Sequence, residues 1–429
     1  MERKRIYLCL AHMSEDGMEQ KYVKEAFDTN WVVPLGPNVN GFEKDLEEFV
    51  NSLTPNPSPK GEGLTKRVVA LSAGTAAVHL GLLNCGVKPG DEVIVQSFTF
   101  CASSHPITYL GATPVFVDSE KDTWNMDPEL MEEAIKDRVA KTGKTPKAIV
   151  PVALYGMPYK IDRIMEIANK YGIPVVEDAA EGFGSKYKGQ VLGTFGKYGV
   201  LSFNGNKMIT TSGGGALITE DEDHWREIMM YATQYRESYP YYQHEKIGYN
   251  YRMSNICAGI GRGQMTVVND HIAHHKHVQK LYEELLKDVK GVTVHSQPAT
   301  GEYDSNYWLC TITLDPSLKI KGQENAYKTI VKGAVGGAAG VIHVADSATT
   351  DCQPNENVEA LRVFMDAAGI EARPVWKPMH KQPVYKNAPA YVNGVSEAVF
   401  KVGMCLPAGP YVTDEDVRYI VDCIKEAIV

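Results

Sequence analysis

Hydrophobic and polar positions alternate in two different ways along the chain, and the change comes near residue 250. Up to Tyr249, short apolar runs rich in β-branched residues are separated by stretches with helical spacing; examples of the runs are "RVVALS", "DEVIVQS", "TPVFVD", "IPVVED" and "YGVLSF". Such alternation is typical of a parallel sheet that is buried on both faces. The sequence therefore predicts an α/β protein with a mainly parallel sheet covered by helices.

The pattern beyond Tyr249 is different. "SNICAGIGRGQMTVVNDHIAHHKHVQKLYEELLKDV" has helical spacing, either as one long helix or with a break. The apolar runs "GVTVHS" and "YWLCTITLD" and a final helix "DEDVRYIVDCIKEAIV" follow. We predict a large domain over residues 1–264 and a smaller α+β domain over 265–429. Thr54–Gly63, rich in proline and glycine, and Val331–Ala360, rich in small residues, are expected to be inserted surface loops.

Composition and charge exclude several classes of protein. The net charge is -9, whereas a general binder of nucleic acid or anionic membranes shows a basic face. No apolar run approaches the ~18 residues of a membrane span, and the N-terminus lacks the apolar core of a signal peptide. The eight cysteines form no CxxC pair, which argues against a zinc site. We expect a cytoplasmic protein without a metal.

Residues suited to ligand binding follow the first predicted strands. In a parallel sheet, ligands collect at the carboxyl ends of the strands. Gly74 and Thr75 follow "RVVALS" and open a helix whose N-terminus can bind phosphate, although an ordinary helix cap is the alternative. Phe100 follows "DEVIVQS"; it can stack on a flat ring or simply belong to the core.

Three later segments add charged and polar groups. Asp178 ends the apolar strand "IPVVED", where a carboxylate is costly unless paired with Mg²⁺ or a protonated ring nitrogen. Ser202 ends "YGVLSF", and Lys207 follows in "SFNGNKMITTSGGG". A lysine in a partly desolvated cleft becomes a nucleophile and general base. "GYNYRMSNI" places Asn250 and Arg252 either near a ligand or in a structural turn.

One cofactor accounts for these groups together. A phosphate site, a stacking aromatic ring, a carboxylate for a ring nitrogen and an activated lysine are what pyridoxal 5'-phosphate needs when it is held as a Schiff base. The Mg²⁺ alternative lacks a phosphate-binding GxxxxGK[ST] loop anywhere in the chain. The sequence therefore predicts a pyridoxal phosphate enzyme.

The motifs also carry a family resemblance. "SAGTAAVHL", "SFTFCAS", "EDAAEGFGSKYKG", "SFNGNK", "TTSGGG" and "GYNYRMSN" closely resemble the sugar-nucleotide aminotransferases of the DegT/DnrJ/StrS group. The resemblance implies the fold-type I aminotransferase architecture, with a mainly parallel sheet of the seven-stranded type. With "RPVWKPMHKQPVY", the chain looks most like the branch that aminates C4 of UDP-linked 4-keto-6-deoxy-N-acetylhexosamines in bacillosamine-type pathways.

The resemblance implies a role for each residue of the cofactor site. Lys207 would bind the cofactor covalently and move protons. Asp178 would hold the pyridinium nitrogen. Three residues would bind the phosphate: Gly74, Thr75 and Ser202.

Further roles follow from the same resemblance. Phe100 would stack on the pyridine ring, and Asn250 would reach the phosphate of the partner subunit, so the site would need a homodimer. Glu181 occupies a position near the ring hydroxyl where many members have glutamine or histidine. Lys377 and His380 fall in a segment expected near the substrate.

The implied reaction is a ping-pong transamination. L-Glutamate would give 2-oxoglutarate and the pyridoxamine form of the cofactor, which would then aminate the UDP-linked keto sugar. A pyridoxal phosphate lyase or desulfurase acting on amino acids is one alternative. A dehydratase of the same family is another, although such relatives replace the lysine that is present here as Lys207. A non-catalytic pyridoxal phosphate-binding regulator would need a DNA-binding module, for which the chain shows no basic helix-turn-helix.

Overall fold

The structure is a computed structural model that describes residues 4–52, 66–327 and 352–429. Its centre is a sheet in two halves, of which one has the order β1-β9-β8-β5 and the other β14-β3-β2-β4. Parallel bridges from Ile149 to Val175 and from Val152 to Asp178 join the halves. The strands are β1 (Arg67–Leu71), β2 (Glu92–Gln96), β3 (Thr113–Val117), β4 (Ile149–Val150), β5 (Val176–Asp178), β8 (Tyr198–Ser202), β9 (Gly215–Thr219) and β14 (Ala390–Tyr391).

The strands of this sheet are parallel except for β9, which pairs antiparallel with both β1 and β8. The mainly parallel sheet that the apolar pattern predicted is therefore confirmed. The exception has a local cause. A parallel crossover needs a dozen or more residues, usually with a helix. The connection from β8 to β9 contains no helix and returns directly, with the Phe203 N–H donating to the Gly214 carbonyl.

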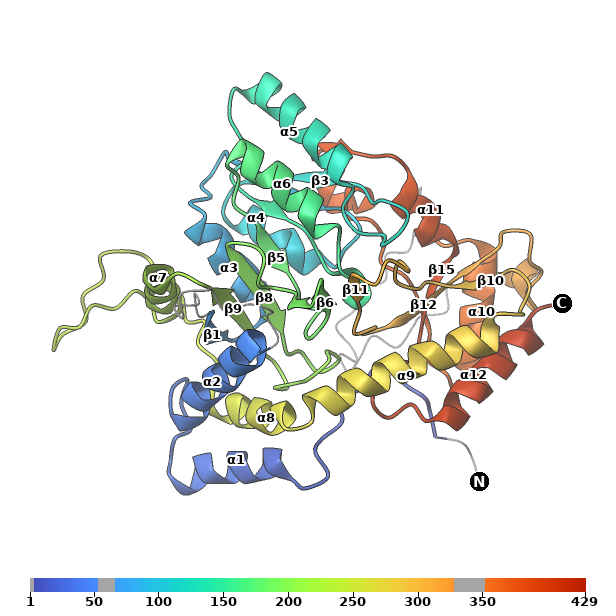
Figure 1. Ribbon diagram of the computed structural model, residues 1–429, viewed down its shortest axis with the longest axis horizontal. Helices are drawn as coiled ribbons and strands as arrows, with labels where there is room; N and C mark the ends of the chain where they lie inside the picture. Colours follow the sequence, from blue (N-terminus) through green and yellow to red (C-terminus); the bar gives the residue numbers. More distant parts are fainter. Residues whose placement is uncertain (1–3, 53–65, 328–351) are drawn as a thin grey trace.

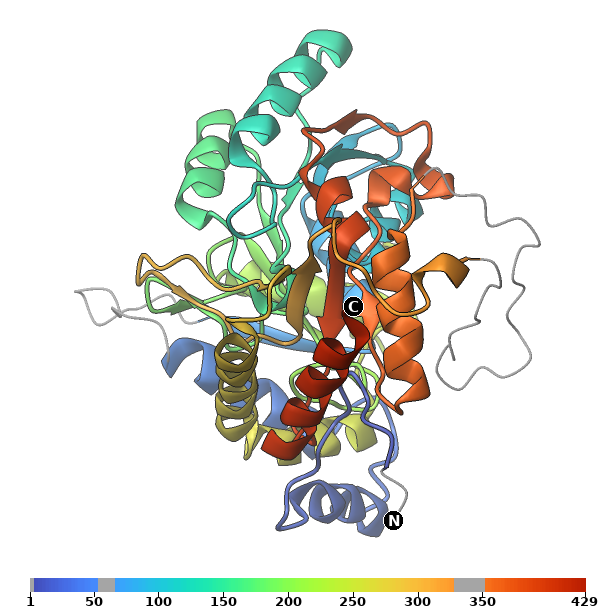
Figure 2. The same cartoon turned by 90° about the vertical axis from the view of Figure 1, so that its right-hand side faces the viewer.

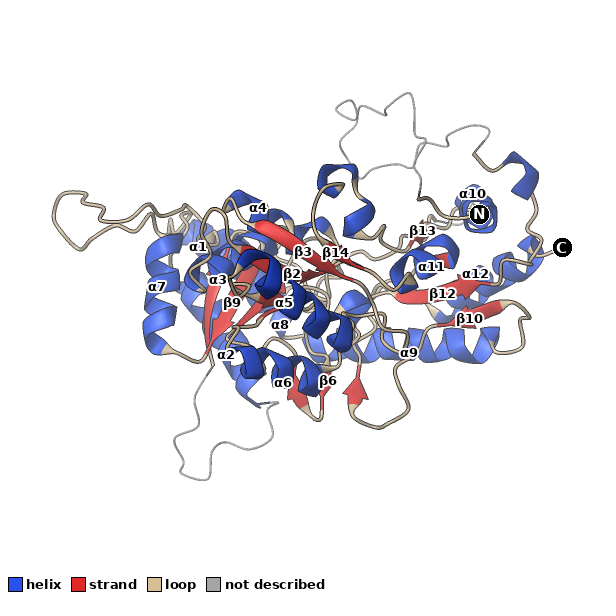
Figure 3. Ribbon diagram, turned by 90° about the horizontal axis from the view of Figure 1, so that it is seen from above, coloured by secondary structure: helices blue, strands red, loops and turns tan. Residues whose placement is uncertain are grey.

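Both faces of the sheet are buried, because successive strand side chains point to opposite sides. Val68 and Ala70 of β1 belong to a core with α2 (Pro37–Ser52), α5 (Pro128–Thr142) and α6 (Ile161–Tyr171). Val69 and Leu71 belong to a second core with α3 (Gly74–Asn84), α4 (His105–Tyr109) and α7 (Glu222–Ala232). Figure 3 shows this sheet and its helices in one half of the elongated molecule.

A second sheet forms the other half. It is antiparallel, with the order β10-β12-β15-β13, and packs with α9, α10 and α12 around its own apolar core (Figure 2). The elements are α9 (Val268–Leu286), β10 (Val292–Val294), β12 (Cys310–Leu314), α10 (Glu356–Ala367), β13 (Arg373–Pro374), β15 (Gly403–Leu406) and α12 (Asp414–Ala427).

The long helix α9 runs from the first half to the second (Figure 1). α8 (Asn255–Met265) precedes it, so the predicted long helix has a break between Met265 and Val268. The boundary at residues 264/265 falls at the end of α8, and the two-domain division stays a prediction. The remaining elements are α1 (Met18–Asp28), α11 (Val395–Val402) and a small sheet of β6 (Lys186–Tyr187), β7 (Gln190–Val191) and β11 (Tyr303–Asp304).

The two expected insertions fall largely outside the described residues: all of Thr54–Gly63 does, and so does Val331–Ala360 up to residue 351. The end of the second stretch is described, and there the expectation of a surface loop is wrong. α10 begins at Glu356, and the side chain of Asn355 caps it by accepting the Val358 N–H. The side chain of Val358 is fully buried. The apolar residues at helical spacing, Val358 and Leu361, outweigh the small-residue composition before them.

Candidate active site

A cavity of about 290 Å³ opens where strands of the first sheet end. The carboxyl ends of parallel strands meet at one sheet edge, so the residues after β1, β2, β5 and β8 converge there. Seven of the predicted site residues line this cavity: Gly74, Thr75, Phe100, Asp178, Glu181, Ser202 and Lys207. Their convergence agrees with a common site, and the role of each residue stays a prediction.

One wall of the cavity is the N-terminus of α3. Ala73 at the N-cap has no side-chain hydrogen-bonding group, so it does not cap the first N–H donors of the helix. A Cβ added to Gly74 would lie 2.9 Å from the Ser202 Cβ, closer than such atoms approach. Gly74 thus allows α3 to approach β8, which places the Thr75 and Ser202 hydroxyls beside the helix end. This arrangement suits a phosphate group.

Asp178 is a buried acceptor at the end of β5. Its Oδ2 accepts a hydrogen bond from Ser103 Oγ at 2.6 Å, and its Oδ1 accepts the Ala180 N–H at 3.1 Å. Burial raises the pKa of this carboxyl above its ordinary value, and the two hydrogen bonds oppose that rise. A cationic ligand group beside Asp178 would offset the cost of burying its charge.

Lys207 lies in the turn between β8 and β9, and its side chain is 13% exposed. Its Nζ is 3.4 Å from Glu181 Oε1 and 4.0 Å from the centre of the Trp308 ring. The other carboxyl oxygen of Glu181 accepts the Tyr155 N–H at 2.7 Å. Burial raises the pKa of Glu181, while the charge of Lys207 lowers it. The lysine is therefore largely removed from solvent, as its flanking apolar strands predicted.

Phe100 stands at the edge of the cavity. Its side chain is 49% exposed, and its ring centre lies 5.3 Å from that of Trp376. One face of Phe100 is thus supported by protein while much of the ring remains open to a ligand. This environment argues against the alternative that Phe100 is simply a core residue.

Three predicted site residues do not line the cavity. Asn250 is exposed, and its backbone bridges to Thr233. Lys377 is partly exposed. The His380 ring lies between Ser97 and Glu397, at 2.7 Å and 3.2 Å, so its nitrogens face these two side chains. A substrate contact by His380 would require the loss of one of these interactions.

Several residues that line the cavity were not among the predicted site residues. Ser103, Asn206, Trp308 and Trp376 all line the cavity. Trp376 occurs in the quoted "RPVWKPMHKQPVY", where its aromatic side chain between prolines was a usable signal. Ser103 ends the quoted "SFTFCAS", but its contact with Asp178 had no signal, because the two residues are 75 positions apart along the chain.

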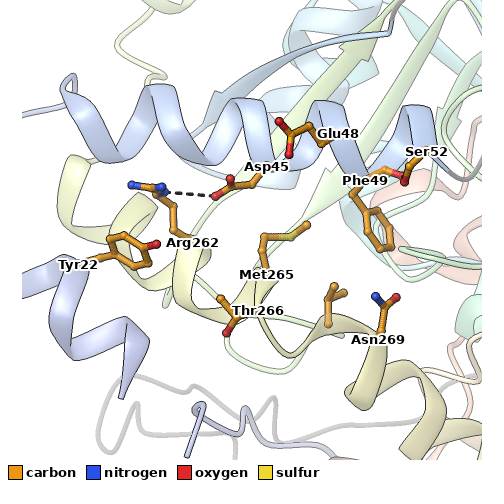
Figure 4. Close-up of a pocket in the computed structure, with 10 residues that line it drawn as sticks. Tyr22, Asp45, Glu48, Phe49, Ser52, Arg262, Met265, Thr266 and Asn269 are labelled. Atoms are coloured by element: carbon orange, nitrogen blue, oxygen red, sulfur yellow. Dashed lines mark hydrogen bonds and ion pairs between the residues drawn. The ribbon is translucent and has the colours of Figure 1, made fainter. Parts of the chain in front are cut away.

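A second hollow, of about 440 Å³, contains none of the predicted site residues (Figure 4). It lies against α2 and α8. The Arg262 guanidinium lies 4.2 Å from the centre of the Tyr22 ring and 3.3 Å from Asp45 Oδ2. These contacts hold the arginine of the lining against Tyr22 and Asp45.

Comparison with known proteins identifies the family. The profile of the DegT/DnrJ/EryC1/StrS aminotransferase family matches residues 13–336 and 324–425. The chain belongs to this family. The predicted aminotransferase activity and fold are thereby confirmed.

Individual relatives agree over nearly the whole chain. EpsN of Bacillus subtilis (strain 168), named as a pyridoxal phosphate-dependent aminotransferase, is 40% identical over 98% of this chain and 95% of its own. The GDP-perosamine synthase of Escherichia coli O157:H7 is 33% identical over 98% of each chain. The crystal structure of a DegT DnrJ EryC1 StrS aminotransferase from Brucella abortus matches with a TM-score of 0.78 at 27% identity, over 96% of this chain and 95% of that one.

Among residues 4–52, 66–327 and 352–429, no helix is both long and apolar enough to cross a membrane. Within the same ranges, no group of three or more histidine, cysteine or acidic side chains is arranged to hold a metal ion.

Proposed function

We propose that this aminotransferase transfers the amino group of L-glutamate to the C4 carbonyl of a nucleotide-linked 4-keto-6-deoxy sugar, with UDP-linked N-acetylhexosamine derivatives as the preferred acceptors. Its cofactor is pyridoxal 5'-phosphate, as the name of its relative EpsN also indicates. The observation that carries the proposal is the convergence of Lys207, Asp178 and the N-terminus of α3 on one cavity. The name of GDP-perosamine synthase supports a nucleotide-linked sugar as the class of substrate.

The residues present fit this cofactor. The uncapped N–H groups of α3, with the hydroxyls of Thr75 and Ser202, offer donors to a phosphate. Asp178 offers a buried carboxylate to a protonated ring nitrogen, and such a charge-assisted bond contributes about 1.5–3 kcal/mol. The exposed face of Phe100 offers a surface for ring stacking.

When bound, pyridoxal phosphate supplies a carbonyl that condenses with amines and a ring that accepts electrons. Lys207 is the nucleophile that holds it and, once released, the base that carries a proton from the α-carbon of the donor to the C4' atom. A positioned general base contributes typically ~10²–10⁴-fold to rate. Asp178 keeps the ring nitrogen protonated. Ser103 and the Ala180 N–H orient Asp178 for this task.

We further propose that two copies of the chain share their sites, with the partner subunit's Asn250 reaching the phosphate. The segment between α7 and Asn250 projects from the body of the protein (Figure 1). It carries apolar side chains open to solvent, with Tyr242 77% and Ile247 86% exposed. Such exposure supports burial against another subunit. Mixing inactive Lys207→Ala and Asn250→Ala proteins should restore partial activity, because a mixed dimer has one intact site.

A spectroscopic titration tests the function. The purified protein with bound cofactor should be yellow, and L-glutamate should convert it to the pyridoxamine form. UDP-linked and GDP-linked 4-keto sugars are then added in parallel, and return of the yellow form identifies the acceptor. If the yellow form returns with the UDP sugar alone, the proposal is supported. If it returns with the GDP sugar alone, the acceptor is GDP-linked and the proposed UDP specificity is wrong. If glutamate causes no change, the proposed donor is wrong.

The cytoplasmic location stays a prediction.

A further inference from the structure

Trp308 lies beside the Lys207 ammonium group and has had no role assigned so far. Trp308 is only 1% exposed, and the centre of its ring lies 4.0 Å from Lys207 Nζ. At this distance, the negative face of an indole attracts a cation. The attraction is strongest where water is excluded, and the Lys207 side chain is only 13% exposed.

The indole is also fixed relative to the lysine. Trp308 Nε1 donates a hydrogen bond of 2.6 Å to the carbonyl of Asn206, which belongs to the peptide group directly before Lys207. The ring therefore cannot move away from the lysine backbone without the loss of this partly buried hydrogen bond. The orientation of the ring, and not only its presence, is specified by the structure.

Asn306 links this tryptophan to the other partner of the lysine. Its side-chain carbonyl accepts the backbone N–H of Trp308 at 2.9 Å, and its side-chain amide donates to the backbone carbonyl of Glu181 at 2.9 Å. Asn306 is fully buried. The aromatic face and the carboxylate that flank Lys207 Nζ are thus held by one shared side chain.

We infer that Trp308 is a positioning residue that holds the free ammonium group of Lys207 between its indole face and the Glu181 carboxylate. This inference rests on the proposed function, in which Lys207 is released from the cofactor during each half-reaction. The released side chain of Lys207 then stays beside the reacting atoms and does not turn towards solvent. The negative charge of Glu181 and the negative face of the indole both attract the ammonium cation.

Three titratable groups act on Lys207 Nζ. They are Glu181 and Asp178 at the sheet edge and Cys9 from the N-terminal segment. Burial raises the pKa of the Cys9 thiol to about 12, so this thiol stays neutral through the range tested below. Both carboxyl side chains are retained in the Trp308 variants, so a difference between variants reports the change at residue 308.

The experiment measures reaction of the apoprotein with pyridoxal phosphate between pH 6 and 11, a range that includes the ordinary pKa of lysine. Borohydride fixes the imine at Lys207, and the mass of the labelled peptide gives the rate at each pH. Only the neutral amine reacts, so the midpoint of the profile reports loss of the ammonium proton. Trp308→Leu should move the midpoint down by about 0.5–1.5 pH units, given the usual strength of a cation–aromatic contact. An upward shift in Trp308→Leu would overturn the inference, because the indole would then not stabilise the ammonium group.

Controls decide between a positioning role and a merely structural one. Trp376→Leu changes another tryptophan of the same cavity, whose ring lies beside those of Phe100 and Tyr155, and its midpoint should match the wild type. Trp308→Phe keeps an aromatic face and should give an intermediate midpoint; it is the deciding variant if Trp308→Leu does not fold.

The outcomes separate this inference from the proposed function. Equal midpoints for the wild type and both Trp308 variants would overturn the positioning role of Trp308. Equal downward shifts in the Trp308 and Trp376 variants would also overturn it, because the effect would then be general to the cavity. If the wild-type protein takes up label at other lysines but not at Lys207, the proposed function itself fails.

Discussion

Asp178→Asn is expected to weaken cofactor binding while leaving the apoprotein at least as stable as the wild type. The asparagine has nearly the same shape, and its hydrogen bonds can be satisfied. Its carbonyl oxygen can accept the Ala180 N–H, and its amide can donate to Ser103 Oγ. Ser103 can then turn its own proton towards Thr99 Oγ1, which lies 2.8 Å away.

The magnitude follows from the charge that is removed. A hydrogen bond to a charged group contributes about 1.5–3 kcal/mol, so the affinity for pyridoxal phosphate should fall roughly 10- to 150-fold. In the apoprotein, which lacks the cofactor, removal of the Asp178 charge should stabilise the protein instead. Burial raises the folded-state pKa of Asp178, so its contribution to stability is greatest at low pH and is lost as the pH rises through that pKa. At neutral pH the burial of Asp178 therefore destabilises the apoprotein, and the asparagine removes this cost.

The assay is cofactor titration by absorbance, together with the Tm of the protein at pH 7.5 with and without pyridoxal phosphate. Glu177→Gln is the matched control. Glu177 is the neighbouring buried carboxylate, does not line the cavity, and accepts backbone N–H groups from Gly193, Phe195 and Gly196. Glutamine turns one acceptor into a donor, so Tm should fall while cofactor affinity is unchanged. Wild-type affinity in Asp178→Asn would refute the ring-nitrogen role.

Three further predictions can be checked on the same protein. Lys207→Ala should abolish turnover but still bind pyridoxamine phosphate, as measured by equilibrium dialysis; turnover near the wild-type rate would remove the assigned role of the lysine. Gly74→Ala should cost about 1–3 kcal/mol of stability, because the added methyl meets Ser202, and should weaken binding of pyridoxal phosphate more than of pyridoxal. An equal effect on both ligands would contradict the phosphate site. Burial lowers the pKa of His275 to about 3, so the unfolded chain takes up a proton at a higher pH than the folded chain. Stability should therefore fall as the pH drops below ~6.5, by up to about 1.4 kcal/mol per pH unit for this residue, and His275→Leu should flatten the dependence of Tm on pH.

Much of the fold and part of the site could be predicted because they depend on local patterns. The strand runs quoted above appear as β1, β2, β3, β5 and β8. Their carboxyl ends meet wherever a parallel sheet forms, so polar residues after each strand were expected to converge. For this reason Gly74, Asp178 and Lys207 were found without knowledge of the strand order.

Other features depend on contacts between distant parts of the chain. β14 lies far along the chain yet pairs with β3 in the first sheet, because its backbone completes an edge there. Its two residues carry no pattern that distinguishes this sheet from the second one. The ring of His380 lies between Ser97 and Glu397, contacts that depend on the packing of its segment, and its place near the substrate stays a prediction.

The sequence by itself determined the alternation of strands and helices, the family and the residues that follow each strand, because each of these is written in consecutive positions. The tertiary structure alone decided what surrounds the reactive groups. Ser103 meets Asp178 across 75 residues, and Trp308 meets the turn of Lys207 across about a hundred. Proton affinity and orientation depend on burial and on such partners, and neither has a local signature in the sequence.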